Sequence, residues 1–437
     1  MKEIFYTEDT PENKISYYLL LVFLVTLPFD RVYSELSLIG LLLHTLLHPA
    51  TGRKFSFRWA GWLVTGLFFL MLISSLYTPH FSDAGRQLEK QLALLLFPLI
   101  AWYSRLDWNK VRAPLLKAFA FSCTFTVIYL YGCAFTAIHQ QGLGWAALFT
   151  PDFLNHSFTA PIDLHATYFS MDVGISVIVA VGLGLKSDKI LVKWGYGLMS
   201  LLLLAAILQL ASRAVCLAML VVINVLVPWL LLSGRSRRIA LLVFVSMSLL
   251  SVVLVTTNKD LYTRYLVSLK QDMQDVRGNA EDPEPRMVRW GCAWELIRES
   301  PWIGYGAGAE VGRLKEKYYT RHLVLSYTHE LNAHNQYLSY WLNTGIGGVL
   351  LYLCVLIAGG MVAVRRRDIL LSTFIVMIVF VSFSENILDT NKGIFFFSFF
   401  FILFLYDRVE LPVAPVGSVE PVSSVEPVGS VALAQVV

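Results

Sequence analysis

Long apolar runs alternate with short polar breaks along almost the whole chain, from Tyr17 to Tyr406. Many runs approach twenty residues, the length that an α-helix needs to cross a hydrocarbon core of roughly 30 Å. The pattern predicts an all-α polytopic membrane protein with about twelve transmembrane helices. Their ranges are near 15–29, 34–48, 59–77, 88–103, 115–138, 166–185, 190–211, 214–233, 239–257, 344–364, 369–388 and 393–406. The range 88–103 begins with two charged residues, so a short or tilted helix is expected there.

The composition agrees with a membrane protein and excludes several soluble classes. Of the 437 residues, 56% are hydrophobic and 15% are charged, whereas soluble domains carry about 25% charged residues. A soluble enzyme, a secreted disulfide scaffold and a nucleic-acid-binding protein are therefore excluded. The five cysteines show no metal-ligand spacing and are interpreted as small packing residues.

Lys and Arg gather in alternate connections between the predicted spans. These basic connections lie at 53–58, 105–112, 186–193, 235–238 and 365–367. By the positive-inside rule they face the cytoplasm, so both termini are expected to be cytoplasmic. The connection at 139–164 contains no Lys or Arg and is expected to face outward.

The same pattern divides the chain into four segments. Residues 1–257 carry the first nine predicted spans, and residues 258–343 form one large polar loop facing outward. Residues 344–406 carry the last three spans. The tail at 407–437 repeats Ser-Val-Glu-Pro-Val and is expected to be a disordered cytoplasmic segment.

The polar loop contains a predicted helix with two arginines in its first turns. Asp282 or Glu284 can cap this helix, and Arg286 and Arg289 follow. Arg286 shares a face with Trp290 four residues later, beside backbone N–H groups at the positive end of the helix dipole. Such a face can bind an anion. The alternative is that the arginines neutralise the preceding acids on a solvated surface.

The sequence Gly304-Tyr-Gly-Ala-Gly308 follows this helix. A nucleotide-binding loop is rejected, because that motif requires a preceding strand. The glycines are instead expected to allow a tight turn back towards the membrane.

A histidine begins the next predicted helix. His334, Tyr337 and Trp341 fall on one face of it, with Asn335 beside the histidine. The positive end of a helix dipole disfavours an imidazolium ion, so a neutral His334 could accept a proton. The alternative is an interfacial histidine within a belt of Tyr and Trp.

Arg213 lies at the tip of the short connection between two apolar spans. A charge placed deep in a membrane costs at least about 2.5 kcal/mol, so such residues usually face a polar cavity or partner. Arg213 either binds an anion such as a phosphate or extends to the outer interface. His165 with Asp172, and Glu385 with Asp389, form weaker polar pairs near the outer ends of spans. The outward loops contain no Asp-x-Asp or Asp-x-Asn motif, so neither a metal nor another cofactor is expected.

Taken in order, these motifs resemble the O-antigen ligase and polymerase superfamily of bacterial inner membranes. The matching residues are Ser212-Arg213, Arg286-x-x-x-Trp290, Gly304-x-Gly306-x-Gly308, His334-Asn-x-x-Leu338 and Gly345. The resemblance implies a GT-C-like, metal-independent, inverting enzyme that transfers a glycan from undecaprenyl diphosphate to an acceptor hydroxyl at the periplasmic face.

The resemblance also implies roles for individual residues. Arg213 and Arg286 would hold the diphosphate, and His334 would accept the acceptor proton or orient its hydroxyl. Substrate-binding residues are predicted at Arg289, Trp290, Asn335, Tyr337 and His165, although the family pattern does not settle the role of Arg289.

The ligase branch, whose acceptor is a lipid A-core sugar, is favoured. The polymerase branch and protein O-oligosaccharyltransferases of the same superfamily stay open as alternatives, as does the oligomeric state. A secondary transporter with twelve spans is the alternative of another class. It would require interrupted helices at matching positions in two halves, and the sequence shows no such symmetry.

Overall fold

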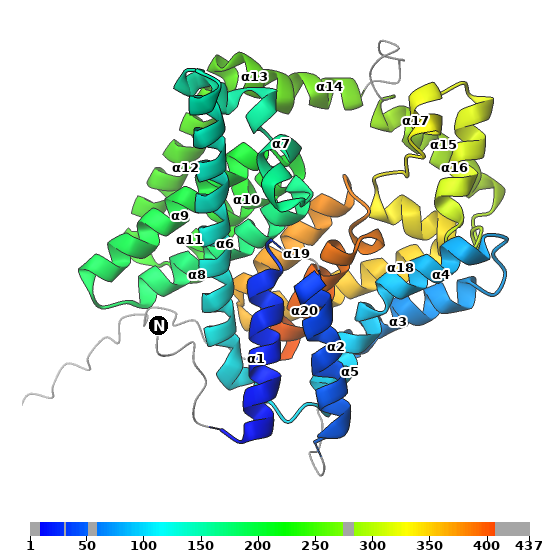
Figure 1. The fold of residues 1–437 in the computed structure, drawn as a ribbon, viewed down its shortest axis with the longest axis horizontal. Coiled ribbons are helices and arrows are strands. Elements are labelled where there is room, and N and C mark those ends of the chain that lie inside the picture. The colour runs from blue at the N-terminus through cyan, green and yellow to red at the C-terminus, as the bar shows by residue number, and fades with distance from the viewer. Residues whose placement is uncertain (1–8, 30–31, 51–58, 274–283, 407–437) are drawn as a thin grey trace, which may run out of the picture.

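A computed structural model describes residues 9–29, 32–50, 59–273 and 284–406, and the described chain is helical without strands. The cytoplasmic tail predicted at 407–437 and the predicted capping residue Asp282 lie outside the described residues. Figure 1 shows two groups of helices on either side of α19 and α20, with the short helices α13 and α14 forming an arm above the space between them.

The helices follow the apolar pattern of the sequence. Along the chain, the first helices are α1 (Pro11–Thr26), α2 (Val32–Leu47), α3 (Trp59–Ser74), α4 (Phe81–Gln91), α5 (Ala93–Tyr103) and α6 (Trp108–Gln140). They are followed by η2 (Trp145–Phe149), η3 (Pro151–Phe153), α7 (His156–Thr159), η4 (Ala160–Ile162), α8 (Ala166–Lys186), α9 (Ile190–Leu210), α10 (Arg213–Val221), η5 (Val222–Leu226), α11 (Val227–Leu231) and α12 (Gly234–Thr257). The polar loop contains α13 (Lys259–Tyr262), η6 (Thr263–Val267), α14 (Ser268–Asp272), α15 (Arg286–Glu299), α16 (Ala309–Thr320) and α17 (Val324–Thr328). The chain continues with α18 (Gln336–Arg366), α19 (Ile369–Ser382), η7 (Ile387–Asp389) and α20 (Asn391–Tyr406).

The protein is a multi-pass membrane protein. Six helical segments of the described chain are long and apolar enough to cross a membrane, and further apolar helices are shorter. The six are α6, α8, α9, the continuous segment from Arg213 to Leu231, α12 and α18. Each predicted range overlaps a helix, and the range 88–103 is divided between α4 and α5. The helix breaks at Leu92, and α5 is a short helix of 11 residues, as expected from the two charged residues that begin this range.

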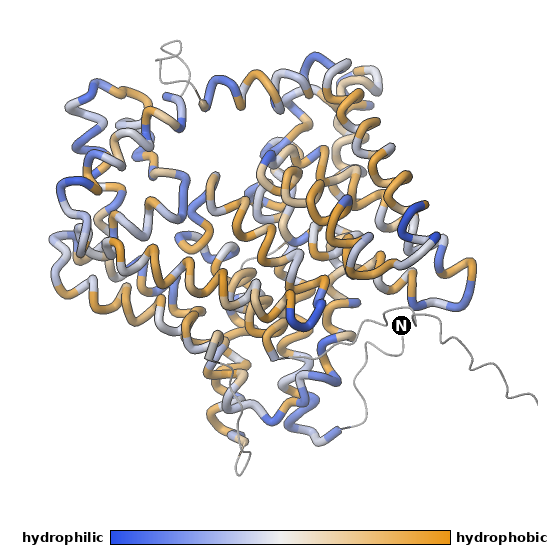
Figure 2. The backbone as a smooth tube through the Cα atoms, turned by 180° about the vertical axis from the view of Figure 1, so that it is seen from behind, coloured by the Kyte–Doolittle hydropathy of each residue, from blue (hydrophilic) through white to orange (hydrophobic). Residues whose placement is uncertain are grey.

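Burial separates inner helices from helices that face outward. In α20 every residue from Gly393 to Leu405 is buried, whereas α12 has no buried residue. Phe374 of α19 packs against Phe396 of α20, with 5.7 Å between the ring centroids. Apolar residues dominate the long helices in Figure 2, while hydrophilic residues gather at turns and in the polar loop. The packed α19–α20 pair therefore gives a rigid frame to the connection between these helices.

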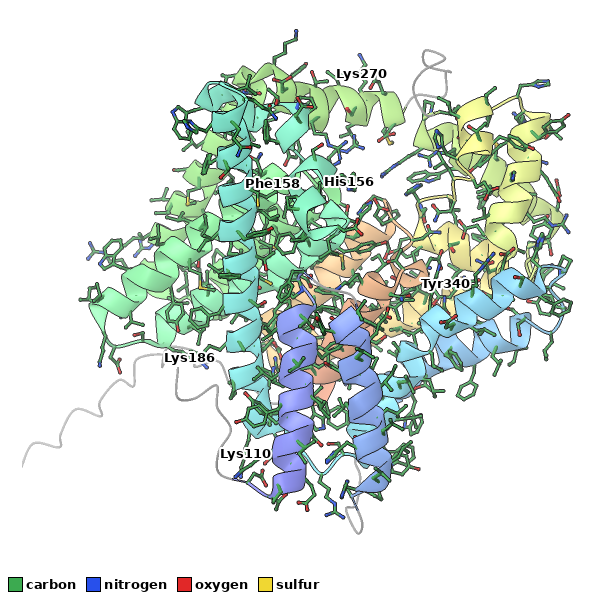
Figure 3. The ribbon with its side chains drawn as sticks, in the orientation of Figure 1. Lys110, His156, Phe158, Lys186, Lys270 and Tyr340 are labelled. Atoms are coloured by element: carbon green, nitrogen blue, oxygen red, sulfur yellow. The ribbon has the colours of Figure 1, made fainter. Side chains whose placement is uncertain are left out.

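Two lysines of the predicted cytoplasmic connections lie away from the polar loop. Lys110 and Lys186 are located towards the end opposite to Lys270, which belongs to the polar loop (Figure 3). This arrangement is the one that the positive-inside pattern predicts.

The three glycines after α15 form the expected tight turn. Gly304, Gly306 and Gly308 have φ angles of 68°, 93° and 74°, in the region that favours glycine. A Cβ atom on Gly306 would lie 2.5 Å from the Cβ of Thr78, and one on Gly304 would lie 2.5 Å from the Leu342 carbonyl oxygen. The turn is therefore wedged between the end of α3 and α18, and the structural interpretation of these glycines is confirmed.

Candidate active site

Two arginines from distant parts of the chain share one carboxylate. Arg213 begins α10, two residues after Ala211, which caps the end of α9 in a left-handed conformation. Its guanidinium forms an ion pair with Asp272 at the end of α14. Arg286, the first residue of α15, places Nε 3.9 Å from the same Asp272 oxygen. The structure therefore brings together the two arginines that the sequence motifs single out.

A third arginine, Arg264 of η6, belongs to the same cluster. Its Nη2 donates to the side-chain oxygen of Asn155 at 2.5 Å, in the amide orientation that satisfies both groups. Burial, and then the nearby charge of Arg213, lowers the pKa of Arg264. The buried Nη1 of Arg213 and Nε of Arg264 have no hydrogen-bond partner in the described part of the chain. The cluster thus offers donors that an anion could use.

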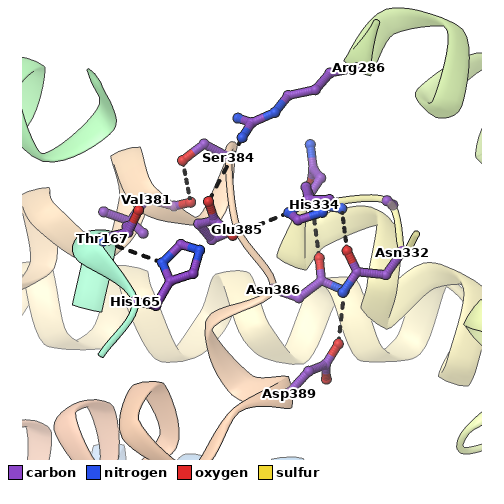
Figure 4. A network of polar contacts seen from close by, with 12 residues as sticks. His165, Thr167, Arg286, Asn332, His334, Val381, Ser384, Glu385, Asn386 and Asp389 are labelled. Atoms are coloured by element: carbon purple, nitrogen blue, oxygen red, sulfur yellow. Dashed lines mark hydrogen bonds and ion pairs between the residues drawn. The ribbon is translucent and has the colours of Figure 1, made fainter. Parts of the chain in front are cut away.

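Glu385 connects this cluster to His334 (Figure 4). It lies between α19 and η7 and is 8% exposed. Its Oε1 is 3.8 Å from Nη2 of Arg286, and its Oε2 is 3.2 Å from Nδ1 of His334. Burial raises the pKa of Glu385, but the hydrogen bond and charge of His334, followed by His165 and Arg286, outweigh it and lower the pKa overall. Glu385 is therefore a carboxylate near neutral pH.

The carboxylate determines how the His334 ring can act. An ionised carboxylate only accepts hydrogen bonds, so Nδ1 of His334 carries the proton and donates it to Glu385. The other ring nitrogen, Nε2, is then left with a free lone pair while the ring is neutral. This is the geometry of a base whose tautomer is fixed by a buried acid.

The predicted helix position of His334 is wrong by two residues. Asn335 is the N-cap of α18 and the helix begins at Gln336, so His334 precedes it in a left-handed conformation with φ of 47°. The ring therefore does not belong to the first helical turn, where the helix dipole was expected to disfavour its charged form, and the dipole does not fix its tautomer. Glu385, more than fifty residues further along the chain, does so.

Arg289 and Trp290 hold the backbone just before His334. Nη1 of Arg289 donates to the carbonyl of Asn332 at 3.5 Å, and Nε1 of Trp290 donates to the carbonyl of Ala333 at 2.8 Å. Arg289 is buried, and burial lowers its pKa. Both side chains are thus engaged within the protein, where they position the segment that carries His334.

Buried acids and an amide hold the same segment from the other side. The carboxylate of Glu310 accepts from the Ala333 N–H at 2.9 Å and from the Asn386 side chain at 3.1 Å. Asn386 also accepts from the Asn335 N–H at 2.7 Å and donates to Asp389 at 2.8 Å. Burial, and then the charge of Asp389, raises the pKa of Glu310 to about 7. The left-handed conformation at His334 is thereby fixed by contacts from three separate elements.

The remaining predicted substrate-binding residues lie around this core. Asn335 is buried and caps α18 by accepting from the N–H groups of Tyr337 and Leu338 at 3.0 and 3.2 Å. The Tyr337 hydroxyl donates to the Val379 carbonyl at 3.3 Å, so this side chain packs on α19. These contacts are structural, and substrate binding by Asn335 and Tyr337 stays a prediction.

His165 is the N-cap of α8 and faces His156, with 4.2 Å between the ring centroids. Its Nδ1 accepts from the Thr167 N–H at 3.3 Å. Burial lowers the pKa of His165 to about 4, so the ring is neutral near neutral pH. Asp172, its predicted partner, is buried further along α8. His165 thus lines the Glu385 side of the cluster, and its neighbour His156 lies below the α13–α14 arm (Figure 3).

The capping prediction for α15 needs correction. Pro285 is the N-cap, without a side-chain capping bond. Glu284 instead accepts from the N–H groups of Leu325 and Ser326 at 3.2 and 2.8 Å, and so ties the start of α15 to α17. Burial raises the pKa of Glu284, but the hydrogen bond from the Ser326 hydroxyl and those from backbone N–H groups outweigh it and lower the pKa overall.

Sequence reasoning missed Arg264, Asp272 and Glu310 as parts of the site. Arg264 and Asp272 lie among other charged residues of a polar loop, where no spacing distinguishes them. Glu310 directly follows the glycine turn, and its burial at 4% exposure was not evident from a helix that is otherwise polar. Glu385 was noted only as a member of a weak pair, because its partners come from other segments.

A comparison with known families agrees with this geometry. Residues 198–353 match a family model described as O-antigen ligase, and this range includes Arg213, Arg286 and His334. No curated protein matches the chain. The chain therefore contains an O-antigen ligase family domain, and the resemblance to that superfamily is confirmed. In general terms the protein is a membrane-embedded glycosyl-transfer enzyme.

Proposed function

We propose that this protein is an O-antigen ligase of a bacterial inner membrane, which transfers a glycan from undecaprenyl diphosphate to a hydroxyl of a lipid A-core sugar. The observation that carries the proposal is the convergence of Arg213, Arg286 and His334 on two carboxylates, Asp272 and Glu385. Such an arrangement combines an anion-binding cluster with a proton acceptor.

The arginines provide what the leaving group needs. When the bond between the anomeric carbon and the phosphate oxygen breaks, the electron pair stays on the diphosphate, so negative charge grows there. Guanidinium groups that are already in place stabilise this charge without reorganising. Arg213 and Arg286 are held by Asp272, and Arg264 stands beside them with an unpartnered Nε. We assign Arg264 to the same role.

His334 and Glu385 act on the acceptor. Nε2 of neutral His334 takes the proton of the acceptor hydroxyl while the hydroxyl oxygen attacks the anomeric carbon, and the configuration at that carbon inverts. Glu385 holds the Nδ1 proton and stabilises the imidazolium that forms. The proton that His334 gains leaves to solvent after the diphosphate departs.

The proposed orientation places the polar loop in the periplasm and both termini in the cytoplasm. It is supported by the basic residues that lie at the end of the molecule opposite to the polar loop (Figure 3). The GT-C-like architecture and the twelve-span topology are part of the same proposal. Membrane lipids surround the apolar faces, of which α12 is the most exposed.

Reconstitution in proteoliposomes tests the proposal. The purified protein is supplied with undecaprenyl-diphosphate glycan and lipid A-core, and each substrate is omitted in turn. Glycan attached to the lipid A-core, with release of undecaprenyl diphosphate, is the expected result. Elongation of the glycan on its carrier would instead identify a polymerase, and attachment to a protein hydroxyl would identify a protein O-oligosaccharyltransferase.

A further inference from the structure

A polar cavity lies behind the segment that carries His334. It has a volume of about 520 Å³, within the range of roughly 300–1,000 Å³ that is usual for ligand pockets. Its walls come from α4, from the glycine turn with α16, and from the end of η7. In Figure 1, α4 and α16 lie on one side of α19 and α20, whereas α10 and α13 lie on the other.

Nearly all residues that line this cavity are of polar type, although the carbon atoms of their side chains form more of its surface than their polar atoms do. Apart from glycines, Val311 is the single apolar residue among those that line it in the described chain. Ligand pockets for apolar molecules are lined mainly by hydrophobic and aromatic groups. A lining of carboxyl, amide and ammonium groups instead fits a ligand that carries many hydroxyl groups, because each hydroxyl both donates and accepts hydrogen bonds.

Charged groups at the rim leave one cation available. Arg86 pairs with Asp83, and Lys315 pairs with Glu330. The side chain of Lys90 has no hydrogen bond or ion pair in the part of the chain that the structure describes, and its charge acts on Asp389 in the cavity. An ammonium group in this position can donate to ligand oxygens without first losing a partner.

The cavity shares its wall with the catalytic segment. Asn332 lines the cavity, and its side-chain oxygen accepts from the His334 N–H at 3.0 Å. Asp389 also lines it and accepts from Asn386, the residue after Glu385. Figure 4 shows Arg286 and Asp389 on opposite sides of the pair formed by Glu385 and Asn386. The segment 332–335 therefore lies between the arginine cluster and the cavity, with Asn332 at the cavity wall and the His334 ring facing Glu385.

We propose that this cavity, between α4 and α16, binds the acceptor saccharide. The inference rests on the proposed function. In an inverting displacement the attacking hydroxyl approaches the anomeric carbon from the face opposite to the leaving group. With the diphosphate on the arginine cluster, the acceptor sugar must come from the other side of His334. The polar cavity occupies that side.

Saturation kinetics of full-length protein in nanodiscs test the cavity. The double variant Lys90→Gln with Lys315→Gln removes two ammonium groups from the lining. Lys317→Gln is the matched control, because Lys317 lies on the same helix and pairs with Glu299 outside the cavity. We expect the double variant to raise the KM for lipid A-core about tenfold, as for a lost charged hydrogen bond, with kcat and donor KM within about twofold of the parent. The control should match the parent.

Binding without turnover separates this inference from the proposed function. Core oligosaccharide freed of its lipid is titrated onto His334→Ala protein, with and without the cavity substitutions. We expect the cavity substitutions to weaken binding about tenfold. A parent protein that transfers no glycan would overturn the proposed function, while this titration would still test the cavity.

Three results would overturn the cavity assignment. One is unchanged acceptor KM and oligosaccharide binding in the double variant. A second is a rise in donor KM instead. The third is a double variant that binds the oligosaccharide normally but loses a dependence on phosphatidylglycerol in the nanodisc, which would assign the cavity to a lipid headgroup.

Discussion

At the scale of single residues, the decisive contact is the hydrogen bond between His334 and Glu385. We predict that His334→Ala lowers the turnover number by about 10²- to 10⁴-fold, because a general base typically contributes that much. Glu385→Gln should also lower it, since an amide can present its N–H group to Nδ1 and favour the wrong tautomer. The rates of a single turnover, measured with donor already bound, test both variants. Donor affinity should stay near the parent value in His334→Ala.

The pH dependence follows from the same pair. Protonation of the His334 imidazole removes the lone pair that accepts the acceptor proton, so activity should fall towards acid pH. The lowered pKa of Glu385 keeps it charged over this range. In His334→Gln the acid limb should disappear together with most of the activity. Turnover within about threefold of the parent, with an unaltered acid limb, would move the base role to another residue.

Arg286 gives a second prediction at this scale. Arg286→Lys should lower kcat/KM about tenfold or more, because a lysine cannot reproduce two parallel N–H donors to a phosphate. Arg298→Lys on the same helix is the control, as Arg298 lies over the ring of Trp294 rather than in the cluster. Steady-state kinetics with varied donor provide the measurement. Equal activity of the two variants would favour the solvated-surface interpretation of Arg286.

At the scale of elements, several segments meet at the four residues 332–335. Trp290 of α15, Glu310 of α16 and Asn386 of the α19–α20 connection each bond to the backbone of this segment. The sequence motifs identified α15 and the start of α18, because capping, proline and apolar periodicity are local signals. The contacts between these elements are not local. The sequence therefore did not reveal that the Trp290 indole donates to the Ala333 carbonyl, and substrate binding by Trp290 stays a prediction.

The buried acid of α16, Glu310, leads to a prediction about stability. The pKa of Glu310 rises from 4.5 to about 7 on folding, so between these values the folded state holds a proton that the unfolded state has lost. Stability is therefore expected to decline as pH rises through this window and to level off above it. The apparent melting temperature should fall by a few degrees from about pH 5 to about pH 8. Glu310→Gln should show a smaller fall.

Glu316→Gln on the same helix is the control for this slope. Glu316 is largely exposed and pairs with Arg313, so its loss should leave the parental pH dependence unchanged. Thermal unfolding followed in detergent at several pH values measures all three proteins. If the melting temperature of Glu310→Gln fell with pH as steeply as that of the parent, Glu310 would be ionised over the whole pH range.

At the scale of the whole molecule, hydropathy predicted the positions of the helices but not their roles as spans. Apolar runs mark helices well because a membrane or a buried core leaves few alternatives for the backbone. The length of an apolar run did not by itself identify a membrane span, because α5 is short and α19 and α20 are buried inner helices of 14 and 16 residues. The site was predictable in its three motif residues, His334, Arg213 and Arg286. Its acidic partners were not predictable, because the sequence around a carboxylate does not indicate with which cation it will pair in the folded protein.

The last prediction concerns the charge balance of the whole site. Three arginines gather where the diphosphate is proposed to bind, and the described residues contain no group of three or more His, Cys, Asp or Glu that could hold a metal ion. Guanidinium groups can supply the stabilisation that a divalent ion gives in other transferases. We therefore expect glycan transfer to proceed at the parental rate in excess EDTA. Loss of activity on chelation, with recovery on adding magnesium, would contradict this and point to Glu310 with Asp389, two acids whose charges act on each other, as ligands. Measuring transfer by Arg286→Lys with and without magnesium would distinguish a metal-dependent from a metal-independent enzyme. Only in a metal-dependent enzyme should the ion restore the activity of this variant.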